Sequence, residues 1–145
     1  MITDLAQRLA DSGITPTPQR VAVFASLVAR RDHPDADVVF RDLRRKMPTL
    51  SKTTVYATMQ LLAERHLIGT VHVEGDRLRY DGCVEFHAHF RCRGCGKVFD
   101  VMLDAPHRKP FARLPEGFVS EDEELVYYGL CPKCKNKRKT NKRKE

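Results

Sequence analysis

The chain has 145 residues, and 26 lysine and arginine side chains against 19 aspartate and glutamate side chains give it a formal net charge of +7. This length suits one ordinary domain or two small ones, and the absence of eighteen consecutive apolar residues excludes a membrane-spanning helix. The first residues contain no basic region followed by an apolar segment, so no secretory signal is expected and the sequence predicts a cytoplasmic protein.

The positive charge is concentrated at one end of the chain. Residues 1–80 hold 12 basic and 9 acidic side chains, residues 81–132 hold 6 and 9, and residues 133–145 hold 8 and 1. Because the rest of the chain is close to neutral, this excess predicts a solvated, disordered basic tail over residues 135–145. Such a tail can add salt-dependent affinity for phosphates, but it cannot select a DNA sequence.

The first eighty residues predict helices followed by one hairpin. Proline, glycine and capping residues separate the apolar stretches, and Asp35 or Asp37 can cap the third helix. The first helix contains Ile2, the second is expected over residues 19–30, the third runs from its cap until Pro48 stops it, and the fourth is expected over residues 52–66. Two short strands are expected over residues 68–73 and 77–80. A helical bundle followed by a β-hairpin is typical of a winged helix-turn-helix domain, which presents one helix to the DNA major groove.

The predicted helix 52–66 has an apolar face and a polar face. Val55, Met59, Leu62 and His66 share the first, whereas Thr53, Tyr56, Ala57 and Gln60 share the second. Hydroxyl groups and a lysine in its first turn can donate to phosphates, and the helix N-terminus adds partial positive charge. An ordinary capped amphipathic helix explains the same pattern. The following hairpin, which carries Arg77 and Arg79, favours the DNA-binding interpretation.

The second half of the chain is expected to be rich in strands. Residues 87–91, 98–103 and 119–127 each predict a strand, and a helix is expected from about residue 106 to residue 114. The sign of the charge changes near Asp81. The sequence therefore predicts an α+β protein with a winged-helix domain over residues 1–80, a hinge over 81–86 and an α/β domain over 87–134.

Four of the five cysteines form two C-x-x-C pairs that 35 residues separate. The pairs are Cys92 with Cys95 and Cys131 with Cys134, and Gly96 permits the tight turn that aims two sulfurs at one point. Four thiolates suit a closed, tetrahedral, structural zinc site. A redox pair or buried free thiols are the alternatives, but a redox C-x-x-C opens a helix after a strand, and neither pair clearly does so. Cys83 is expected to be a packing residue.

A second group of metal-ligand residues surrounds the first cysteine pair. His87 and His89 alternate along a predicted strand, so both imidazoles face the same side. Asp100 lies on the next strand, and Asp81 lies at the hinge. If His33 joins them, these residues offer three imidazoles and two carboxylates, which suit divalent iron, manganese or zinc better than magnesium or calcium. For each residue taken alone, a surface or capping role is the alternative.

The chain resembles the Fur family of metal-dependent repressors over residues 5–134. The resemblance rests on these stretches: Thr15-x-Thr17-Pro18-Gln19-Arg20, His33-Pro34-x-Ala36-Asp37, Ser51-Lys52-Thr53-Thr54-Val55-Tyr56, Arg79-Tyr80-Asp81, His87-x-His89-x-x-Cys92-x-x-Cys95-Gly96-Lys97 and Tyr128-Gly129-x-Cys131-x-x-Cys134. It implies a homodimer on double-stranded operator DNA, with the second domain serving for dimerisation. It also implies regulatory iron(II) or manganese(II) ligands at His33, Asp81, His87, His89 and Asp100, and DNA contacts at Gln19, Arg20, Ser51, Lys52, Thr53, Thr54, Tyr56 and Arg77.

The two carboxylates distinguish subgroups within that family. Iron sensors typically carry glutamate at the positions of Asp81 and Asp100, whereas the peroxide-sensing PerR subgroup carries aspartate at both, as this chain does. The resemblance therefore implies peroxide sensing through oxidation of His33 or His87. The alternative is a repressor that reports iron, manganese or zinc level without this chemistry.

Some positions depart from the family pattern. Ala57 replaces a residue that usually follows the tyrosine of the recognition helix, and Ala88, His107 and Glu123 stand where iron sensors often hold a further metal. A redox enzyme, a metal hydrolase or an architectural nucleic-acid-binding protein would be an alternative function. The sequence contains no Gly-rich phosphate loop, nucleophile elbow or HExxH motif in support of an enzyme.

Overall fold

The computed structural model describes residues 2–103 and 112–142, and the chain divides into two compact units, Met1–Glu85 and Phe86–Glu145. This division falls at the end of the segment that the sequence predicts as a hinge. None of the helices in the described segments is long and apolar enough to cross a membrane.

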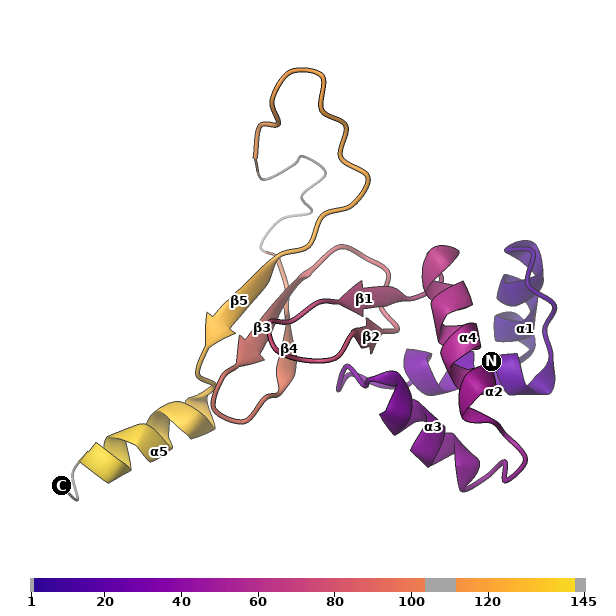
Figure 1. The fold of residues 1–145 in the computed structure, drawn as a ribbon, viewed down its shortest axis with the longest axis horizontal. Helices are drawn as coiled ribbons and strands as arrows, with labels where there is room; N and C mark the ends of the chain where they lie inside the picture. Colours follow the sequence, from indigo (N-terminus) through magenta and orange to yellow (C-terminus); the bar gives the residue numbers. More distant parts are fainter. Residues whose placement is uncertain (1, 104–111, 143–145) are drawn as a thin grey trace. The chain divides into compact units, whose positions relative to one another are not determined.

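The first unit contains four helices and a two-stranded sheet (Figure 1). Helices α2, α3 and α4 each begin at a side chain that caps the first turn: Thr17 accepts from Arg20, Asp35 from Val38, and Ser51 from Thr54. Asp35 is therefore the cap of the third helix, which leaves Asp37 available for other contacts. The elements are α1 (Ile2–Asp11), α2 (Pro18–Val28), α3 (Ala36–Arg44), α4 (Lys52–Glu64), β1 (Gly69–Val71) and β2 (Arg79–Asp81).

The core of the first unit lies between these helices. Val55, Met59 and Leu62 of α4 are fully buried, as the sequence predicts, and they pack with Phe24 and Leu27 of α2. Burial of each such side chain contributes about 1.5–3 kcal/mol. The prediction fails at His66, which follows the end of α4, is exposed and has a φ of 55°; Thr58 is buried instead. The opposite face of α4, including Tyr56, stays exposed.

The hairpin is attached to the loop that precedes α3. Strands β1 and β2 pair antiparallel, with Gly69 opposite Asp81. The Tyr80 N–H of β2 donates to the carbonyl of Pro34 at 3.0 Å, and Arg79 Nη1 donates to the carbonyl of His33 at 3.1 Å. The same strand therefore ends at a candidate ligand, Asp81, and holds the backbone of another, His33.

The second unit is a three-stranded sheet with a helix at its end. Its elements are β3 (Ala88–Cys92), β4 (Val98–Val101), β5 (Val126–Gly129) and α5 (Pro132–Lys142), and the strand order is β4-β3-β5. Strand β3 pairs antiparallel with β4 and parallel with β5. The strand predicted over 119–127 is wrong for most of its length, because consecutive acidic residues at 121–124 disfavour a strand. Most of the helix predicted over 106–114 lies outside the described residues.

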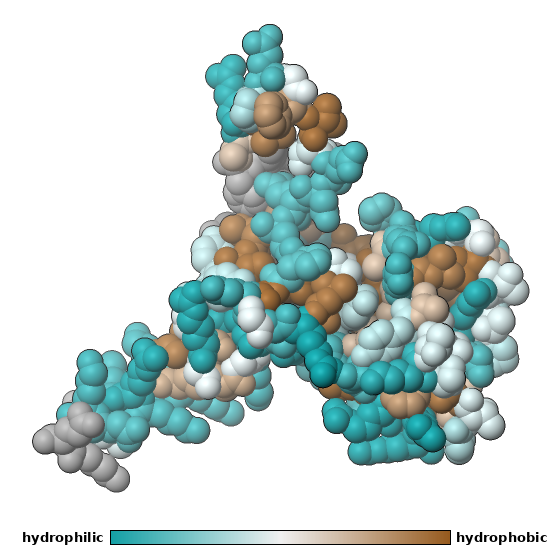
Figure 2. Space-filling model, viewed as in Figure 1, coloured by the Kyte–Doolittle hydropathy of each residue, from teal (hydrophilic) through white to brown (hydrophobic). Residues whose placement is uncertain are grey.

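The C-terminal segment forms helix α5, whereas the sequence predicted a disordered tail from residue 135. Pro132 occupies the first turn, where its missing N–H has no partner to lose, and the Lys135 N–H donates to the Cys131 carbonyl at 2.9 Å. Lysine favours helices, and Lys139 and Lys142 lie in the last turn, where cations are stabilising. None of the helix's described side chains is buried, and Figure 2 shows it as hydrophilic along its length.

Candidate metal centres and nucleic-acid surface

The four predicted cysteines meet in one cluster inside the second unit. Cys92 ends β3, Cys95 lies in the following turn, Cys131 follows β5, and Cys134 lies in the first turn of α5. Their sulfurs all lie within 4.8 Å of one another, and Cys95 Sγ is 3.9 Å from Cys131 Sγ. A tetrahedral zinc site with Zn–S bonds of ~2.3 Å needs sulfurs about 3.8 Å apart. The donor set and its spacing therefore fit zinc.

The backbone around the cluster explains this convergence. The Cys92 N–H donates to the Lys97 carbonyl at 2.9 Å, and the Gly96 N–H donates to the Cys92 carbonyl at 2.9 Å, which closes the turn. Gly96, which was expected to permit the tight turn, has a positive φ of 76°. A Cβ at Gly94 would lie 2.8 Å from Cys134 Sγ, so this turn packs directly against the other cysteine pair.

Hydrogen bonds prepare one of the sulfurs for metal binding. The Cys131 N–H donates to Cys92 Sγ at 3.3 Å, and this bond lowers the pKa of the Cys92 thiol to about 6. The Cys134 thiol is hydrogen bonded to the other sulfurs, above all to that of Cys131, and this raises the pKa of Cys134. Thiolates are the form that binds zinc, so zinc binding would displace the remaining thiol protons.

One reason for excluding a redox pair was wrong. Cys131 and Cys134 do open a helix directly after a strand, since α5 follows β5. The structure nevertheless brings this pair against Cys92 and Cys95, which a two-cysteine redox site does not require. Cys83 is a half-buried free thiol in the first unit, and its packing role stays a prediction.

The first unit holds two of the predicted regulatory ligands side by side. His33 Nε2 lies 3.2 Å from Asp81 Oδ2, and both residues are buried. The other Asp81 oxygen, Oδ1, accepts from the Cys83 N–H at 2.8 Å, which orients the carboxylate. His33 has a φ of 51°, a conformation that L-residues rarely adopt and that clusters at functional sites.

The second unit holds the other three predicted ligands. Antiparallel pairing of β3 with β4 places His89 directly opposite Asp100. His87 Nε2 lies 3.0 Å and His89 Nε2 3.7 Å from the same oxygen, Asp100 Oδ1, and the two imidazole rings are 4.5 Å apart. The alternation that the sequence predicts for the two histidines therefore brings both rings to one carboxylate. Glu123 is exposed, Ala88 is buried, and His107 lies outside the described residues.

The predicted DNA contacts all lie in the first unit, on the starts of two helices and on the hairpin loop. Tyr56 and Lys52 are exposed on α4, and Arg77 is exposed between β1 and β2. The Ser51 and Thr54 hydroxyls are hydrogen bonded to each other at 2.8 Å in the helix cap, which reduces their capacity to reach DNA. Arg20 donates to the Thr15 carbonyl at 3.0 Å. The remaining members of the set, Gln19 and Thr53, lie on α2 and α4.

Sequence reasoning missed the structural roles of three residues that build these sites. Arg79 donates a hydrogen bond to the His33 carbonyl, and Gly82 packs against the end of α2. The Asp37 carboxylate interacts with Lys52, Tyr56 and Arg77, which are all predicted to touch DNA. The sequence offered Asp37 as a possible helix cap and Arg79 as part of a DNA-binding hairpin, but it did not predict these contacts. Gly82, next to a candidate ligand, had no signal beyond its residue type.

The family model described as the ferric uptake regulator family matches residues 11–128. The peroxide operon regulator of Bacillus subtilis is 29% identical over 137 residues and covers 94% of each chain. The transcriptional regulator FurA of Mycobacterium bovis is 32% identical over 137 residues, 92% of this chain and 91% of that protein. The solved ferric uptake regulator Fur of Helicobacter pylori superposes with a TM-score of 0.68 at 20% identity, covering 93% of this chain and 94% of the other.

These matches and the fold define a metal-responsive transcriptional regulator. The chain belongs to the ferric uptake regulator family, because the matched stretch includes both the winged-helix elements and the strands that carry the histidines. Members of this family are transcriptional regulators and not enzymes, so the prediction of a non-enzymatic protein is confirmed. Regulators of this family bind operator DNA and act as dimers.

Proposed function

We propose that this protein is a homodimeric, metal-dependent repressor that senses peroxide through oxidation of a ligating histidine. The observation that carries the proposal is the identity of the two carboxylates. Each is an aspartate, and each lies against a histidine Nε2, at 3.2 Å for Asp81 with His33 and at 3.0 Å for Asp100 with His87. The family resemblance associates aspartate at both positions with the peroxide-sensing PerR subgroup.

Two kinds of metal ion have separate roles in this proposal. The cysteine cluster holds zinc as part of the fold, because four thiolates leave no open coordination position for chemistry. The pair His33 and Asp81 and the trio His87, His89 and Asp100 together bind one regulatory ion, iron(II) or manganese(II). Imidazole and carboxylate donors suit these ions. Bound iron(II) would be the group that reacts with peroxide. Manganese(II) would serve as a less reactive corepressor.

The protein groups determine what oxidation does. The Nε2 atoms of His33 and His87 point toward carboxylates in their own units, which is the arrangement that a shared cation requires. A histidine whose ring gains an oxygen atom is a weaker ligand. A regulatory ion that joins the two units favours one arrangement of them over others, and weaker binding reduces that preference. Loss of the ligand would therefore lower affinity for operator DNA.

The hairpin offers a physical link between ion and DNA. Strand β2 carries Asp81, and the loop before it carries Arg77, a predicted DNA contact. Arg79 of the same strand holds the His33 carbonyl. An ion bound by His33 and Asp81 would stiffen the base of this hairpin and limit where Arg77 can lie. Metal binding and DNA binding would then be coupled through one short strand.

The proposed dimer is supported by apolar side chains on the second unit. Phe99, Met102, Phe118, Val119 and Tyr127 are between 41% and 88% exposed. Figure 2 shows hydrophobic surface on the segment that joins β4 to β5. Both outer strands of the described sheet, β4 and β5, also have an edge with no neighbouring strand among the described residues. Exposed apolar surface and open strand edges mark protein interfaces.

Peroxide treatment of the iron-loaded protein tests the proposal. Anaerobic protein loaded with iron(II) and then exposed to peroxide should gain one oxygen atom on a peptide that contains His33 or His87, as measured by tandem mass spectrometry. Affinity for DNA, measured on the same sample, should fall in proportion. Manganese-loaded protein is the control and should stay unmodified and bound. Unmodified histidines with intact DNA binding would instead support the metal-level alternative, which the similarity to FurA favours.

The length of the carboxylate side chain at Asp100 should set the response. Replacing Asp100 with glutamate keeps the charge but moves the carboxylate by about one methylene, which can slow a reaction that depends on geometry by roughly tenfold or more. Asp100→Glu should therefore keep metal-dependent DNA binding while histidine oxidation slows. Asp122→Glu, at an exposed position of the same unit, is the matched control. An unchanged oxidation rate would show that aspartate does not set the sensing mode.

A further inference from the structure

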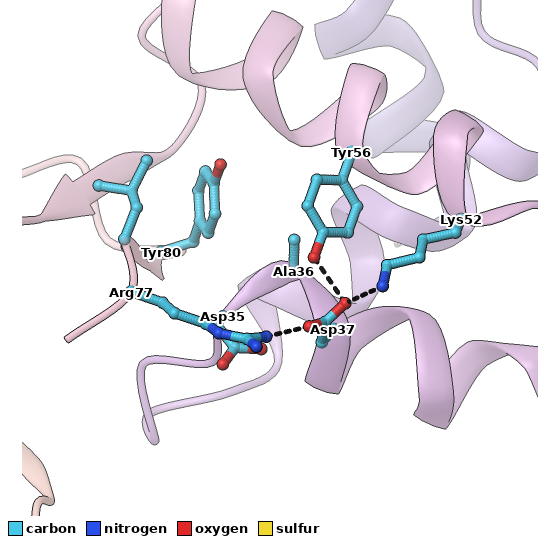
Figure 3. A pocket seen from close by; sticks show the side chains of 8 residues that line it. Asp35, Ala36, Asp37, Lys52, Tyr56, Arg77 and Tyr80 are labelled. Carbon is cyan, nitrogen blue, oxygen red and sulfur yellow. Dashed lines mark hydrogen bonds and ion pairs between the residues drawn. The ribbon is translucent and has the colours of Figure 1, made fainter.

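A single carboxylate on α3 contacts three side chains that are predicted to face DNA. Asp37 Oδ1 lies 2.8 Å from Lys52 Nζ and accepts from the Tyr56 hydroxyl at 2.5 Å. The other oxygen, Oδ2, pairs with Arg77 Nη1. Figure 3 shows these three groups converging on Asp37 from two elements, the recognition helix α4 and the hairpin loop. Asp37 is therefore one of two carboxylates, with Asp35, in a surface pocket of the first unit that also contains the cations Lys52 and Arg77.

Asp37 is not the side chain that caps its own helix. Asp35 caps α3 by accepting from the Val38 N–H at 2.9 Å, so the Asp37 carboxylate is directed outward. The side chains of Lys52 and Arg77 remain 58% and 66% exposed, whereas that of Asp37 is 29% exposed. The cations thus stay accessible to a ligand from outside, while the carboxylate occupies the position between them.

The same groups would suit a phosphate of the DNA backbone. An ammonium, a guanidinium and a hydroxyl are the donors that proteins use most for DNA phosphates. Lys52 first, then Tyr56 and Arg77, hold the pKa of Asp37 well below its usual range, so the carboxylate is ionised at neutral pH. A phosphate that approaches this pocket must therefore displace a full negative charge.

We propose that Asp37 is a specificity-determining residue that competes with DNA phosphate for Lys52 and Arg77 and thereby weakens binding to non-operator DNA. This inference rests on the proposed DNA-binding function. Non-specific binding comes almost entirely from phosphate contacts, so a competitor for two cations lowers it directly. Operator binding loses less, because base contacts add to it and do not depend on those cations.

Tyr56 gives the competition a second consequence. Its hydroxyl has one proton, and that proton is donated to Asp37. The phenol oxygen therefore offers only a lone pair outward, which suits a base-edge donor such as adenine N6 or cytosine N4 and repels a phosphate oxygen. Asp37 thus reduces phosphate contacts and holds the tyrosine ready for base contacts.

A second ion pair on α3 supplies the matched control. Asp42 Oδ2 lies 2.8 Å from Arg30 Nη1, so Asp42→Asn removes the same charge from the same helix and also breaks an arginine pair. Arg30 is only 20% exposed, keeps Asp32 as a partner at 2.7 Å and is not a predicted DNA contact. General effects of net charge should therefore appear equally in Asp42→Asn and Asp37→Asn, whereas the local effect appears only in the latter.

The test compares two duplexes with the manganese-loaded full chain. One is the duplex that the wild-type protein enriches from a random-sequence library, and the other is a shuffled duplex of the same composition. Asp37→Asn should bind the shuffled duplex about tenfold more tightly than Asp42→Asn at 0.1 M salt. Each new phosphate contact changes the slope of log affinity against log salt concentration by ~0.9, which at 0.1 M corresponds to a gain of about tenfold. The ratio of enriched to shuffled affinity should fall.

Three other results would overturn the proposal. The affinity of Asp37→Asn could equal that of Asp42→Asn on both duplexes, or Asp37→Asn could bind both duplexes more weakly. Either result would give Asp37 a purely structural role. A Lys52→Gln change added to Asp37→Asn should cancel the gain on the shuffled duplex, and persistence of the whole gain would exclude Lys52 as the released group. If the wild-type protein enriched no duplex, that result would contradict the proposed function instead. The comparison of Asp37→Asn with Asp42→Asn on the shuffled duplex would still test the role of Asp37.

Discussion

Replacing Cys131 with serine should unfold the second unit and leave the first unit folded. The buried apolar residues of the second unit, among those the structure describes, are Ala88, Cys92, Val98 and Cys131. A core of this size cannot offset the entropy of ordering the sheet, and two of its four members are candidate zinc ligands. Structural zinc sites in small domains contribute roughly 10–16 kcal/mol of binding energy to folding. Loss of one thiolate should remove most of it.

The expected result is loss of bound zinc, loss of the dimer and loss of amide protection over β3, β4 and β5. Hydrogen exchange with mass spectrometry measures protection in each unit separately, and elemental analysis measures zinc. Amides of α2 and α4 should keep wild-type protection, because their core contains no cysteine ligand. Cys83→Ser is the control, since this thiol lies outside the cluster. Wild-type zinc content and protection in Cys131→Ser would contradict the structural role of the cluster.

Removal of the regulatory ion should have a different result. Chelation that leaves zinc in place should keep both units folded, because the candidate regulatory ligands rest on ordinary hydrogen bonds and strand pairing. His89 is held opposite Asp100 by the β3–β4 ladder, and Asp81 by β2 and the Cys83 N–H. Only affinity for DNA should fall. The separation of a folding ion from a regulatory ion depends on this difference.

Local signals in the sequence were sufficient for most of the first unit. Ser51 and Pro18 mark helix starts through hydrogen bonding and a fixed φ, and the apolar spacing of α4 defines its buried face. The cysteine cluster was equally predictable, because each C-x-x-C turn is a local structure and four thiolates favour one ion. The alternation of His87 and His89 predicted their common side, although their shared partner oxygen depends on the β3–β4 register.

The features that could not be predicted depend on contacts between distant segments or on competing local effects. Asp37 and Arg77 are 40 residues apart, and no periodicity relates them. Helix α5 begins with Pro132 and with the hydrogen bond from the Lys135 N–H to the Cys131 carbonyl, and these local effects compete with the repulsion between its many cations. The failed part of the strand predicted over residues 119–127 begins at apolar Val119, but the acidic run at 121–124 that follows prevents it.

Gly82 illustrates this limit and leads to the second large effect. A Cβ on Gly82 would lie 2.4 Å from the Leu27 carbonyl oxygen and 2.8 Å from Val28 Cα, both backbone atoms at the end of α2. Backbone atoms of a packed helix cannot rotate away as a side chain can, so the chain at residue 82 must move. Overpacking of this kind costs on the order of 1–3 kcal/mol.

Gly82→Ala should therefore weaken manganese(II) binding at least ~tenfold, as changes to the groups that orient a metal ligand usually do. The displaced residue lies between Asp81 and Cys83, whose N–H orients the Asp81 carboxylate at 2.8 Å, so the carboxylate should move away from His33 Nε2. Titration of zinc-loaded protein with manganese(II) measures the affinity, and thermal unfolding measures the stability of the first unit.

Gly75→Ala is the control: its Cβ meets nothing within 4 Å, and its φ of 68° costs about 1–2 kcal/mol for a non-glycine residue. Both variants should lose stability, but only Gly82→Ala should lose manganese affinity. Equal manganese affinity in the two variants would show that the packing of Gly82 against α2 does not position Asp81 for the ion.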